Sequence, residues 1–251
     1  MYYIRGTELA QKGLEDLKEA IKLRKQLNPD FNPSIKVYCD DIRNPYYKGI
    51  KHDGNEVGIT VFNAREQKRR EASGEICIDK STAVDPIKDL DGGQMFGCTA
   101  EALIQLLKFW NIDVKGKDIC VIGRSDNVGK AIFELLNQRN ATVTLCHSYT
   151  KNLEDKLSNS DIIISAAPTG VYFDTPENAE NIVLIDIGNN FEDLDSWLAR
   201  TPIRGGIGPV TRVMLLYHAF YKEVERVSFR EYLKKSECYE KDKKDYTKET
   251  R

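Results

Sequence analysis

The sequence predicts an α/β protein organised around a doubly wound parallel sheet. Residues 119–122 are an apolar run, ICVI, that is too short for a helix and suits a buried parallel strand. A turn with a glycine at each end, Gly123 and Gly129, comes next, and apolar residues at helical spacing follow over 131–136. Comparable apolar runs alternate with helical segments further along the chain, which favours a parallel sheet. These runs occupy residues 141–146, 162–166 and 182–187.

The composition limits the class of protein. The 251 residues are enough for one large domain or two small domains with real cores. A formal net charge of -2 predicts no general attraction to nucleic acid or to anionic membranes. No run approaches the ~20 apolar residues that span a bilayer, and the charged first residues do not resemble a signal peptide. We therefore expect neither a nucleic acid nor a membrane as partner.

The cysteines and histidines predict no metal site. None of the six cysteines belongs to a C-x-x-C pair, and the three histidines lie far apart in the sequence. Cys120 and Cys146 lie inside apolar strand-like runs. This pattern fits buried, reduced thiols in a cytoplasmic protein better than a zinc site or a disulfide framework.

The segments before this sheet predict a second, smaller α/β domain. A helix with one apolar face is predicted over residues 8–26, and two proline-containing clusters end it. The segments that follow are, in order, a strand at 35–39, a short helix at 46–56, a strand at 57–62, a charged helix at 63–73, a short strand at 75–78, a loop at 83–97 and an apolar helix at 99–110.

The segments after the glycine turn complete the sheet and end in a helix. A short helix at 152–157 separates two of the strands. Glycine and proline residues over 201–211 predict a loop that opens a helix from Val213 to about Val227. The charged end of the chain predicts a solvated tail.

The turn from Gly123 to Gly129 has the arrangement of a phosphate-binding site. A strand, a glycine turn and a helix aim free backbone N–H groups and a helix N-terminus at one point. The spacing is G-x-x-x-x-x-G rather than G-x-G-x-x-G, so the motif alone indicates a nucleotide only weakly. The alternative is that the two glycines merely turn the chain and let the helix approach the strand.

Seven segments together resemble the bifunctional methylenetetrahydrofolate dehydrogenase/methenyltetrahydrofolate cyclohydrolase family, called FolD in bacteria. No single segment is decisive, but the set is specific because all seven segments occur in the family's order. The segments are KDLDG at 88–92, GCTA at 97–100, VIGRS at 121–125, NATVT at 140–144, CHSYT at 146–150, DIG at 186–188 and GGIGPVT at 205–211.

The resemblance implies the domain organisation and the ligands. It implies a folate-side domain over residues 1–98, completed by a C-terminal helix over 212–235, and an NADP-binding Rossmann domain over 99–211, with a charged tail over 236–251. In the family, a cleft between the two domains holds a tetrahydrofolate derivative and the cofactor. Family members are usually homodimers, so the resemblance implies a homodimer here.

The catalytic pair of the family is a helical Y-x-x-x-K motif preceded by two acidic residues. Counting from the acidic pair at 40–41 places Tyr47 on the tyrosine and Lys51 on the lysine. Residues four apart share one helix face, so a ring and an amine would lie side by side. In the family the lysine assists the attack of water on the methenyl bridge.

A second count gives a different register for the same motif. Counting back from Gly58 gives Tyr46 and Ile50, because one residue is missing between the lysine and the glycine. The first count is preferred because it keeps the tyrosine, the lysine and the acidic pair. Lys48 is the next lysine to consider if that register is wrong.

The folate pocket implied by the resemblance includes Asp91, Gly205 and Gly206. Asp91 matches the aspartate that grips the pterin ring, since a carboxylate can accept two N–H bonds from an aminopterin edge. A turn-forming role for Asp91 before two glycines remains an alternative. The chain departs from the family between Gly58 and Asp91, where it is shorter than usual and the glutamine that partners the lysine is not identifiable. Arg204 stands where the family has proline.

The cofactor preference is predicted from the end of the second strand of the sheet. NAD-selective sites place Asp or Glu there, against the ribose 2′-hydroxyl. Here residues 147–150 contain no acid, and Arg124 with Ser148 would suit a 2′-phosphate, although a solvated charge and a loop cap are the alternatives. The cofactor-binding residues that the resemblance implies are Thr99, Gly123, Arg124, Ser125, Gly129, Ser148 and Asn189.

Two functions of different classes follow. The first is an enzyme that oxidises 5,10-methylenetetrahydrofolate to 5,10-methenyltetrahydrofolate with NADP and hydrolyses the product to 10-formyltetrahydrofolate. The second is a non-catalytic descendant that binds folate or nucleotide as a regulator or assembly partner, which the shortened first domain motivates. Detectable turnover separates the two.

Overall fold

The computed structural model describes residues 2–37, 43–63, 82–83, 88–90, 93–94, 97–193 and 195–226. The chain forms two compact units. Unit 1 comprises Met1–Asp16 and Asp85–Leu215, and unit 2 comprises Leu17–Val84 and Leu216–Arg251. Of the three divisions, one falls inside the long helix α1 (Thr7–Leu27), one inside the long helix α7 (Ile207–Arg226) and one between residues 84 and 85.

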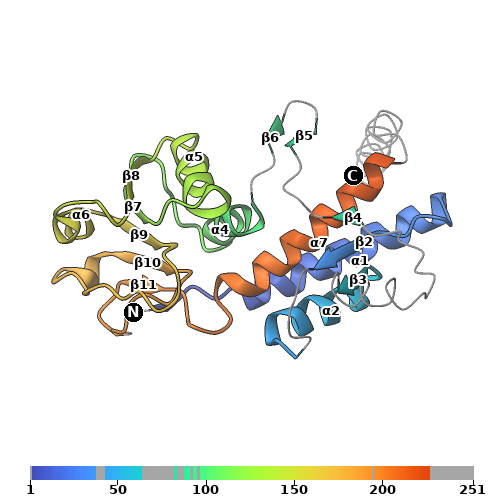
Figure 1. The fold of residues 1–251 in the computed structure, drawn as a ribbon, viewed down its shortest axis with the longest axis horizontal. Helices are drawn as coiled ribbons and strands as arrows, with labels where there is room; N and C mark the ends of the chain where they lie inside the picture. Colours follow the sequence, from blue (N-terminus) through green and yellow to red (C-terminus); the bar gives the residue numbers. More distant parts are fainter. Residues whose placement is uncertain are drawn as a thin grey trace, which may run out of the picture. The chain divides into compact units, whose positions relative to one another are not determined.

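Unit 1 is built on a six-stranded sheet in which every pairing is parallel (Figure 1). This confirms the predicted parallel α/β sheet and its strands, and the apolar residues of β7, β9 and β10 are buried. In spatial order the strands are β1 (Tyr2–Tyr3), β11 (Ala199–Arg200), β10 (Val183–Asp186), β9 (Ile162–Ser165), β7 (Asp118–Ile122) and β8 (Thr142–Cys146).

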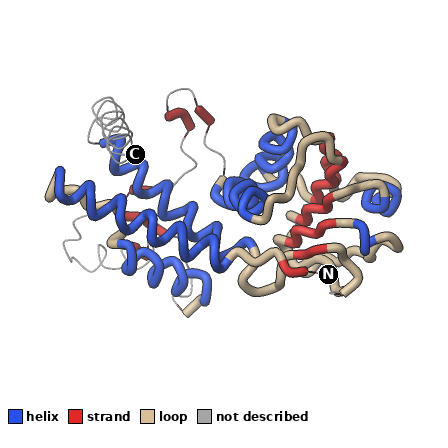
Figure 2. The backbone as a smooth tube through the Cα atoms, turned by 180° about the vertical axis from the view of Figure 1, so that it is seen from behind, coloured by secondary structure: helices blue, strands red, loops and turns tan. Residues whose placement is uncertain are grey.

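Helical segments separate β7, β8, β9 and β10 along the chain, whereas β11 follows β10 without a helix between them. Figure 2 shows the helices and strands in different colours. The predicted helices at 99–110, 131–136 and 152–157 are present with small changes in their bounds. The helical segments of unit 1 before α7 are α4 (Cys98–Phe109), the π-helix η1 (Asp126–Lys130), α5 (Ala131–Asn137), α6 (Leu153–Ser158) and the 3₁₀-helix η2 (Ala179–Asn181).

Three features of unit 1 differ from the sequence-based expectation. Strands β1 and β11 were not predicted, because two residues are too few to show an alternating pattern. Residues 2–3 therefore belong to this sheet, whereas the prediction placed them in the folate-side domain. Helix α7 begins at Ile207 instead of Val213, because Pro209 lies in the first turn, where its missing N–H group costs no hydrogen bond. The predicted loop at 83–97 contains a short antiparallel pair, β5 (Lys88–Leu90) and β6 (Gly93–Gln94).

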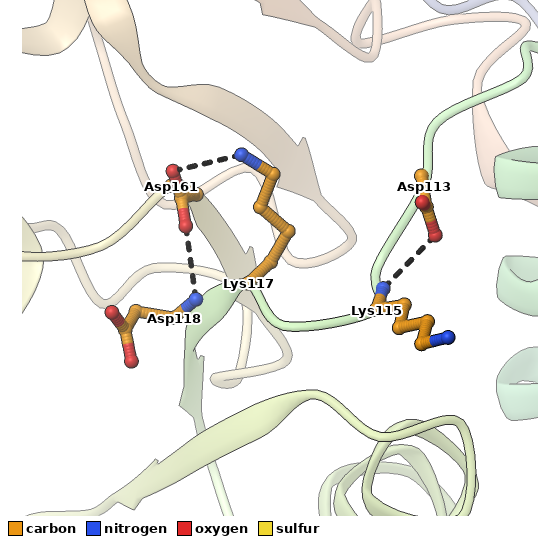
Figure 3. Close-up of polar contacts among 5 residues, drawn as sticks. All are labelled: Asp113, Lys115, Lys117, Asp118 and Asp161. Atoms are coloured by element: carbon orange, nitrogen blue, oxygen red, sulfur yellow. Dashed lines mark hydrogen bonds and ion pairs between the residues drawn. The ribbon is translucent and has the colours of Figure 1, made fainter.

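The amino ends of two neighbouring strands are joined through Asp161 (Figure 3). Its carboxylate accepts a hydrogen bond from the backbone N–H of Asp118 at 2.9 Å and forms an ion pair with Lys117 Nζ at 3.3 Å. The preceding turn is fixed by Asp113, whose Oδ1 accepts a hydrogen bond from the backbone N–H of Lys115 at 3.0 Å. These contacts lie at the amino ends of β7 and β9. The candidate functional residues follow the opposite, carboxyl ends of the strands.

Cys120 and Cys146 pack inside the sheet. Both are fully buried and unpaired, and the Cys120 thiol donates a weak hydrogen bond to Cys146 Sγ at 3.6 Å. That bond and burial raise the pKa of Cys120 well above its usual range, so it remains a thiol. The predicted burial of these two cysteines is confirmed.

Unit 2 contains a small parallel sheet and helix α2 (Pro45–Val57). The sheet has the order β3 (Thr60–Asn63), β2 (Ser34–Val37) and β4 (Thr82–Ala83), with both pairings parallel. Phe31 packs edge-on against Phe220 of α7, with ring centroids 5.6 Å apart. The helix predicted at 63–73 does not begin at Asn63, which ends β3. Residues 64–73, the predicted strand at 75–78 and the predicted tail at 236–251 lie outside the described residues. No helix in the described part of the chain is long and apolar enough to cross a membrane.

Candidate functional site

The glycine turn after β7 is held by close backbone contacts. Gly123 has a left-handed φ of 108°, which glycine adopts without strain, and its N–H donates to the carbonyl of Cys146 at 2.9 Å. Gly129 is buried in η1, and a Cβ atom built on it would lie 1.9 Å from the Gly123 carbonyl oxygen. Any larger residue at 129 would therefore push the helix away from the turn. The two glycines let helix and strand approach, and this contact also places the helix N-terminus at the strand end.

The N-terminus of η1 is suited to an anion. Ser125 precedes η1, and no side chain among the described residues caps this end. Arg124 and Ser125 are both exposed. Asp126 is neutralised by Lys130, whose Nζ lies 2.6 Å from its carboxylate, and this hydrogen bond lowers the pKa of Asp126. Uncapped N–H groups beside an exposed guanidinium fit the phosphate groups of a dinucleotide.

Ser148 lies in a tight turn after β8. The backbone N–H of His147 donates to Thr150 Oγ1, and the N–H of Thr150 donates back to the His147 carbonyl, both at 2.8 Å. Ser148 itself is exposed. Because Ile122 and Cys146 are partners in the β7–β8 register, Arg124 and Ser148 each lie two residues beyond one paired position. The two predicted 2′-phosphate ligands thus follow neighbouring strands at the same edge of the sheet.

Asn189 follows β10 at this same edge. It is exposed between the buried residues Gly188 and Asn190, and it has a left-handed φ of 56°. Asn tolerates this region better than most residues because its short polar side chain can bond locally. The fold therefore fixes the backbone conformation of Asn189, while its side chain is exposed.

Replacing Asn189 tests this constraint. We expect Asn189→Ile to lower the free energy of unfolding by about 1–2 kcal/mol, because a β-branched residue is strained at this φ. Asn189→Gly is the matched control. It should change the free energy of unfolding by only about a few tenths of a kcal/mol, because glycine adopts this φ without strain. Urea denaturation of the three proteins measures the difference. Equal stability of the Ile and Gly variants would contradict the left-handed backbone.

A buried polar network, which the sequence did not reveal, supports the loop that contains Asn189. Both carboxylate oxygens of Asp186 accept the backbone N–H of Asn190, each at 2.9 Å, and Oδ2 also accepts the N–H of Phe191 at 3.1 Å. Burial raises the pKa of Asp186, and these hydrogen bonds oppose the rise. Arg200 is also buried, and it donates from its guanidinium to the carbonyl oxygens of Thr201 and Asp193. The one feature of the sequence that could have indicated this network is Asp186, a carboxylate at the end of an apolar strand.

The remaining predicted residues of unit 1 lie at element starts. Thr99 is in the first turn of α4, and the residue before that helix, Gly97, lies against the carbonyl of Asn127 in η1. Gly205 has a left-handed φ of 81°, and its carbonyl accepts the N–H of Gly6 at 2.8 Å. Gly206 immediately precedes α7. Most of the predicted cofactor residues thus follow the carboxyl ends of β7, β8 and β10, whereas Thr99 lies on α4.

Tyr47 and Lys51 lie on α2 in unit 2. Asn44 caps this helix, since its side chain accepts the backbone N–H of Tyr46 at 2.8 Å and of Tyr47 at 3.4 Å. Pro45 occupies the first turn, so the helix starts at a defined residue despite its two glycines. Tyr47 is buried and Lys51 is exposed. Asp91 and the acidic pair at 40–41 lie outside the described residues.

One surface pocket in unit 1 lies away from this edge. Its volume is about 510 Å³, and its walls include Glu177, Glu180, Asp193 and Asp195. Four carboxylates repel anions, so this pocket suits neither a phosphate group nor a folate carboxylate.

Comparison with known proteins identifies the family. Residues 97–227 match the family described as tetrahydrofolate dehydrogenase/cyclohydrolase, NAD(P)-binding domain. The bifunctional protein FolD of Agathobacter rectalis is 34% identical over an alignment 254 positions long, gaps included, which covers 84% of this chain and 89% of that protein. The chain belongs to the tetrahydrofolate dehydrogenase/cyclohydrolase family. The resemblance inferred from the seven sequence segments is therefore confirmed.

Solved structures agree with the FolD-type fold. A 5,10-methylenetetrahydrofolate dehydrogenase from the silkworm, Bombyx mori, superposes with a TM-score of 0.70 at 25% identity, covering 90% of this chain and 99% of that chain. The methylenetetrahydrofolate dehydrogenase-cyclohydrolase of Trypanosoma brucei, solved with NADP and an inhibitor, gives a TM-score of 0.72 at 21% identity, covering 91% and 99%. The Rossmann-type fold class predicted from the sequence is confirmed.

Proposed function

We propose that this FolD-family protein oxidises 5,10-methylenetetrahydrofolate to 5,10-methenyltetrahydrofolate with NADP and hydrolyses the product to 10-formyltetrahydrofolate. The observation that carries the cofactor choice is the pair of turns after β7 and β8. Arg124 and Ser148 are both exposed there, and residues 147–150 contain no carboxylate that would repel a 2′-phosphate. Membership of the family supports the folate substrate.

The residues of unit 1 would hold the cofactor by its charges and its backbone contacts. The uncapped N-terminus of η1 would bind the pyrophosphate, and Arg124 and Ser148 would bind the 2′-phosphate. The main chain of Asn189 would contact the nicotinamide, which accepts the hydride that no side chain can carry. Gly205 and Gly206 would allow backbone to approach the folate.

The hydrolytic step would depend on Tyr47 and Lys51. The structure supports the first register of the Y-x-x-x-K motif, because the alternative register puts Ile50 at the lysine position. Ile50 is only 1% exposed and carries no group that can exchange a proton. Lys51 is exposed on the same helix and can contact a substrate and water. We assign the tyrosine ring to substrate packing and the amine to the attack of water.

A direct assay tests the proposed function. The purified chain is given methylenetetrahydrofolate with NADP or with NAD, and reduced nicotinamide and methenyltetrahydrofolate are followed by absorbance. The methenyl form survives acid, whereas reduced nicotinamide does not, so the two products are measured separately. We expect faster turnover with NADP. Binding of both ligands without turnover would instead support a non-catalytic descendant, and equal or faster turnover with NAD would contradict the cofactor assignment.

Asp91 is proposed to hold the pterin ring. We expect Asp91→Asn to raise the KM for methylenetetrahydrofolate by about ten- to a hundredfold, because a charge-assisted hydrogen bond is replaced by a neutral one. The dissociation constant of NADP should stay nearly unchanged. If both ligands bind more weakly, Asp91 shapes its turn and does not contact folate.

Two further properties are proposed from family membership. The chain is expected to act in the cytoplasm and to form a homodimer, which sedimentation at several protein concentrations would measure. A monomer at every concentration would contradict the dimer.

A further inference from the structure

The side chain of Asn190 joins two loops at the carboxyl edge of the sheet. Its Nδ2 group donates to the carbonyl oxygens of Pro168, at 3.0 Å, and Val171, at 2.7 Å, both in the loop after β9. Its Oδ1 atom accepts the hydroxyl of Ser165, the last residue of β9, at 2.6 Å. Asn190 belongs to the loop after β10, so one carboxamide connects the ends of two neighbouring strands.

The main chain of Asn190 adds to this connection. Its N–H donates to Asp186 at the end of β10, and its carbonyl accepts the N–H of Phe173 at 2.9 Å. Asn190 is 0% exposed, so no water competes for these bonds. A buried polar group whose donors and acceptors are all satisfied rigidifies its surroundings, whereas losing one partner leaves others buried and unpaired.

The loop that Asn190 fixes contains Asn189. Asn189 is exposed at the carboxyl edge, and its left-handed backbone lies between the buried Gly188 and Asn190. The N–H groups of Ile187 and Gly188 both donate to the Ser165 carbonyl, at 2.9 and 3.3 Å, so the start of this loop is tied to β9 as well. Asn189 is thus presented from a segment that is anchored on both sides.

We propose that Asn190 is a positioning residue for hydride transfer, acting through the backbone of Asn189. This inference rests on the proposed function, in which Asn189 contacts the nicotinamide. The phosphate groups of the cofactor are assigned to the turns after β7 and β8, which make none of the Asn190 side-chain contacts. Loosening the Asn189 loop should therefore disturb the nicotinamide while the rest of the cofactor stays bound.

The test separates kcat from cofactor binding. In Asn190→Ala we expect kcat for NADP reduction to fall by about ten- to a hundredfold, since small misplacements of reacting groups cost rates of this size. The KM and the dissociation constant for NADP should stay nearly unchanged. Ser165→Ala is a milder variant that removes only the hydroxyl donor, and its kcat should fall less, again without loss of NADP affinity. If Asn190→Ala does not fold, the kcat and NADP affinity of Ser165→Ala test the proposal instead.

Asn178→Ala is the matched control. Asn178 Nδ2 also donates to a backbone carbonyl of another segment, that of Ser158, at 2.8 Å. Ser158 ends α6 before β9, and Asn178 precedes β10, so this bond lies on the amino-terminal side of the same two strands. We expect this variant to lose stability and keep kcat. Parallel loss of stability, kcat and NADP affinity in Asn190→Ala and Ser165→Ala would overturn the proposal and make Asn190 a structural residue.

Hydrogen exchange provides a measurement that does not require turnover. In Asn190→Ala the amides of Phe173 and Phe191 should exchange faster, while the amides of Ile163 and Leu184 inside the strands should keep their protection. If the unmutated chain has no activity, the proposed function fails, and this experiment still measures whether Asn190 couples the two loops. Unchanged exchange and unchanged kcat in an active enzyme would overturn the positioning role alone.

Discussion

Replacement of Lys51 by methionine is expected to slow the hydrolysis of methenyltetrahydrofolate by at least about a hundredfold, the size of a lost general acid–base contribution. Methionine is close to lysine in length but has no amine. Hydride transfer depends mainly on holding the folate carbon against the nicotinamide, so NADP reduction should remain measurable. The decay of added methenyltetrahydrofolate and the reduction of NADP, measured on the same preparation, give the two rates.

Lys48→Met is the control for this experiment. Lys48 and Lys51 are both exposed on α2, so the two substitutions remove the same charge from the same helix. We expect Lys48→Met to hydrolyse methenyltetrahydrofolate at the rate of the unmutated protein. Loss of hydrolysis in Lys48→Met with retention in Lys51→Met would show that the motif has been assigned in the wrong register.

The unmutated protein should itself be a weak cyclohydrolase. The resemblance implies a glutamine that partners the catalytic lysine, but the segment between Gly58 and Asp91 is shorter than usual and no residue in it can be assigned to that role. Loss of this partner is expected to slow the attack of water more than hydride transfer, which depends mainly on positioning. We expect acid-stable methenyltetrahydrofolate to accumulate during NADP reduction. If it does not accumulate, another group has taken over the role of the glutamine.

The sequence predicted the parts of the fold whose stability comes from long apolar patterns. β7, β9 and β10 are buried on both faces, and their runs of isoleucine, leucine and valine are visible without any partner strand. β1 and β11 could not be recognised, because a two-residue strand is defined only by the strand beside it. Helix α2 was predicted within one residue at each end, and the Asn44 cap and Pro45 stabilise its start although Gly49 and Gly54 weaken it.

The places of the candidate cofactor residues in the fold were predictable where they depend on neighbours in the chain. Gly123, Arg124 and Ser148 follow strand ends, and strand ends can be read from apolar runs. The Asn190 contacts could not be predicted, because they join residues separated by 19 to 25 positions, and asparagine in a loop has no distinguishing pattern. Such contacts depend on which strands become neighbours, and this is a property of the folded sheet.

Replacement of Arg124 by glutamine is expected to reduce the preference for NADP over NAD by about ten- to a hundredfold, because a charge-assisted contact to the 2′-phosphate is lost. NAD has no 2′-phosphate, so its KM should stay nearly unchanged and the KM for NADP should rise. Adding Ser148→Ala should reduce the preference further.

Lys117→Gln is the control for charge alone, since Lys117 pairs with Asp161 at the amino ends of the strands. Raising the salt concentration should weaken NADP binding in the unmutated protein more than in Arg124→Gln. Equal losses in Arg124→Gln and Lys117→Gln would mean that NADP responds to net charge, and that Arg124 is a solvated loop residue.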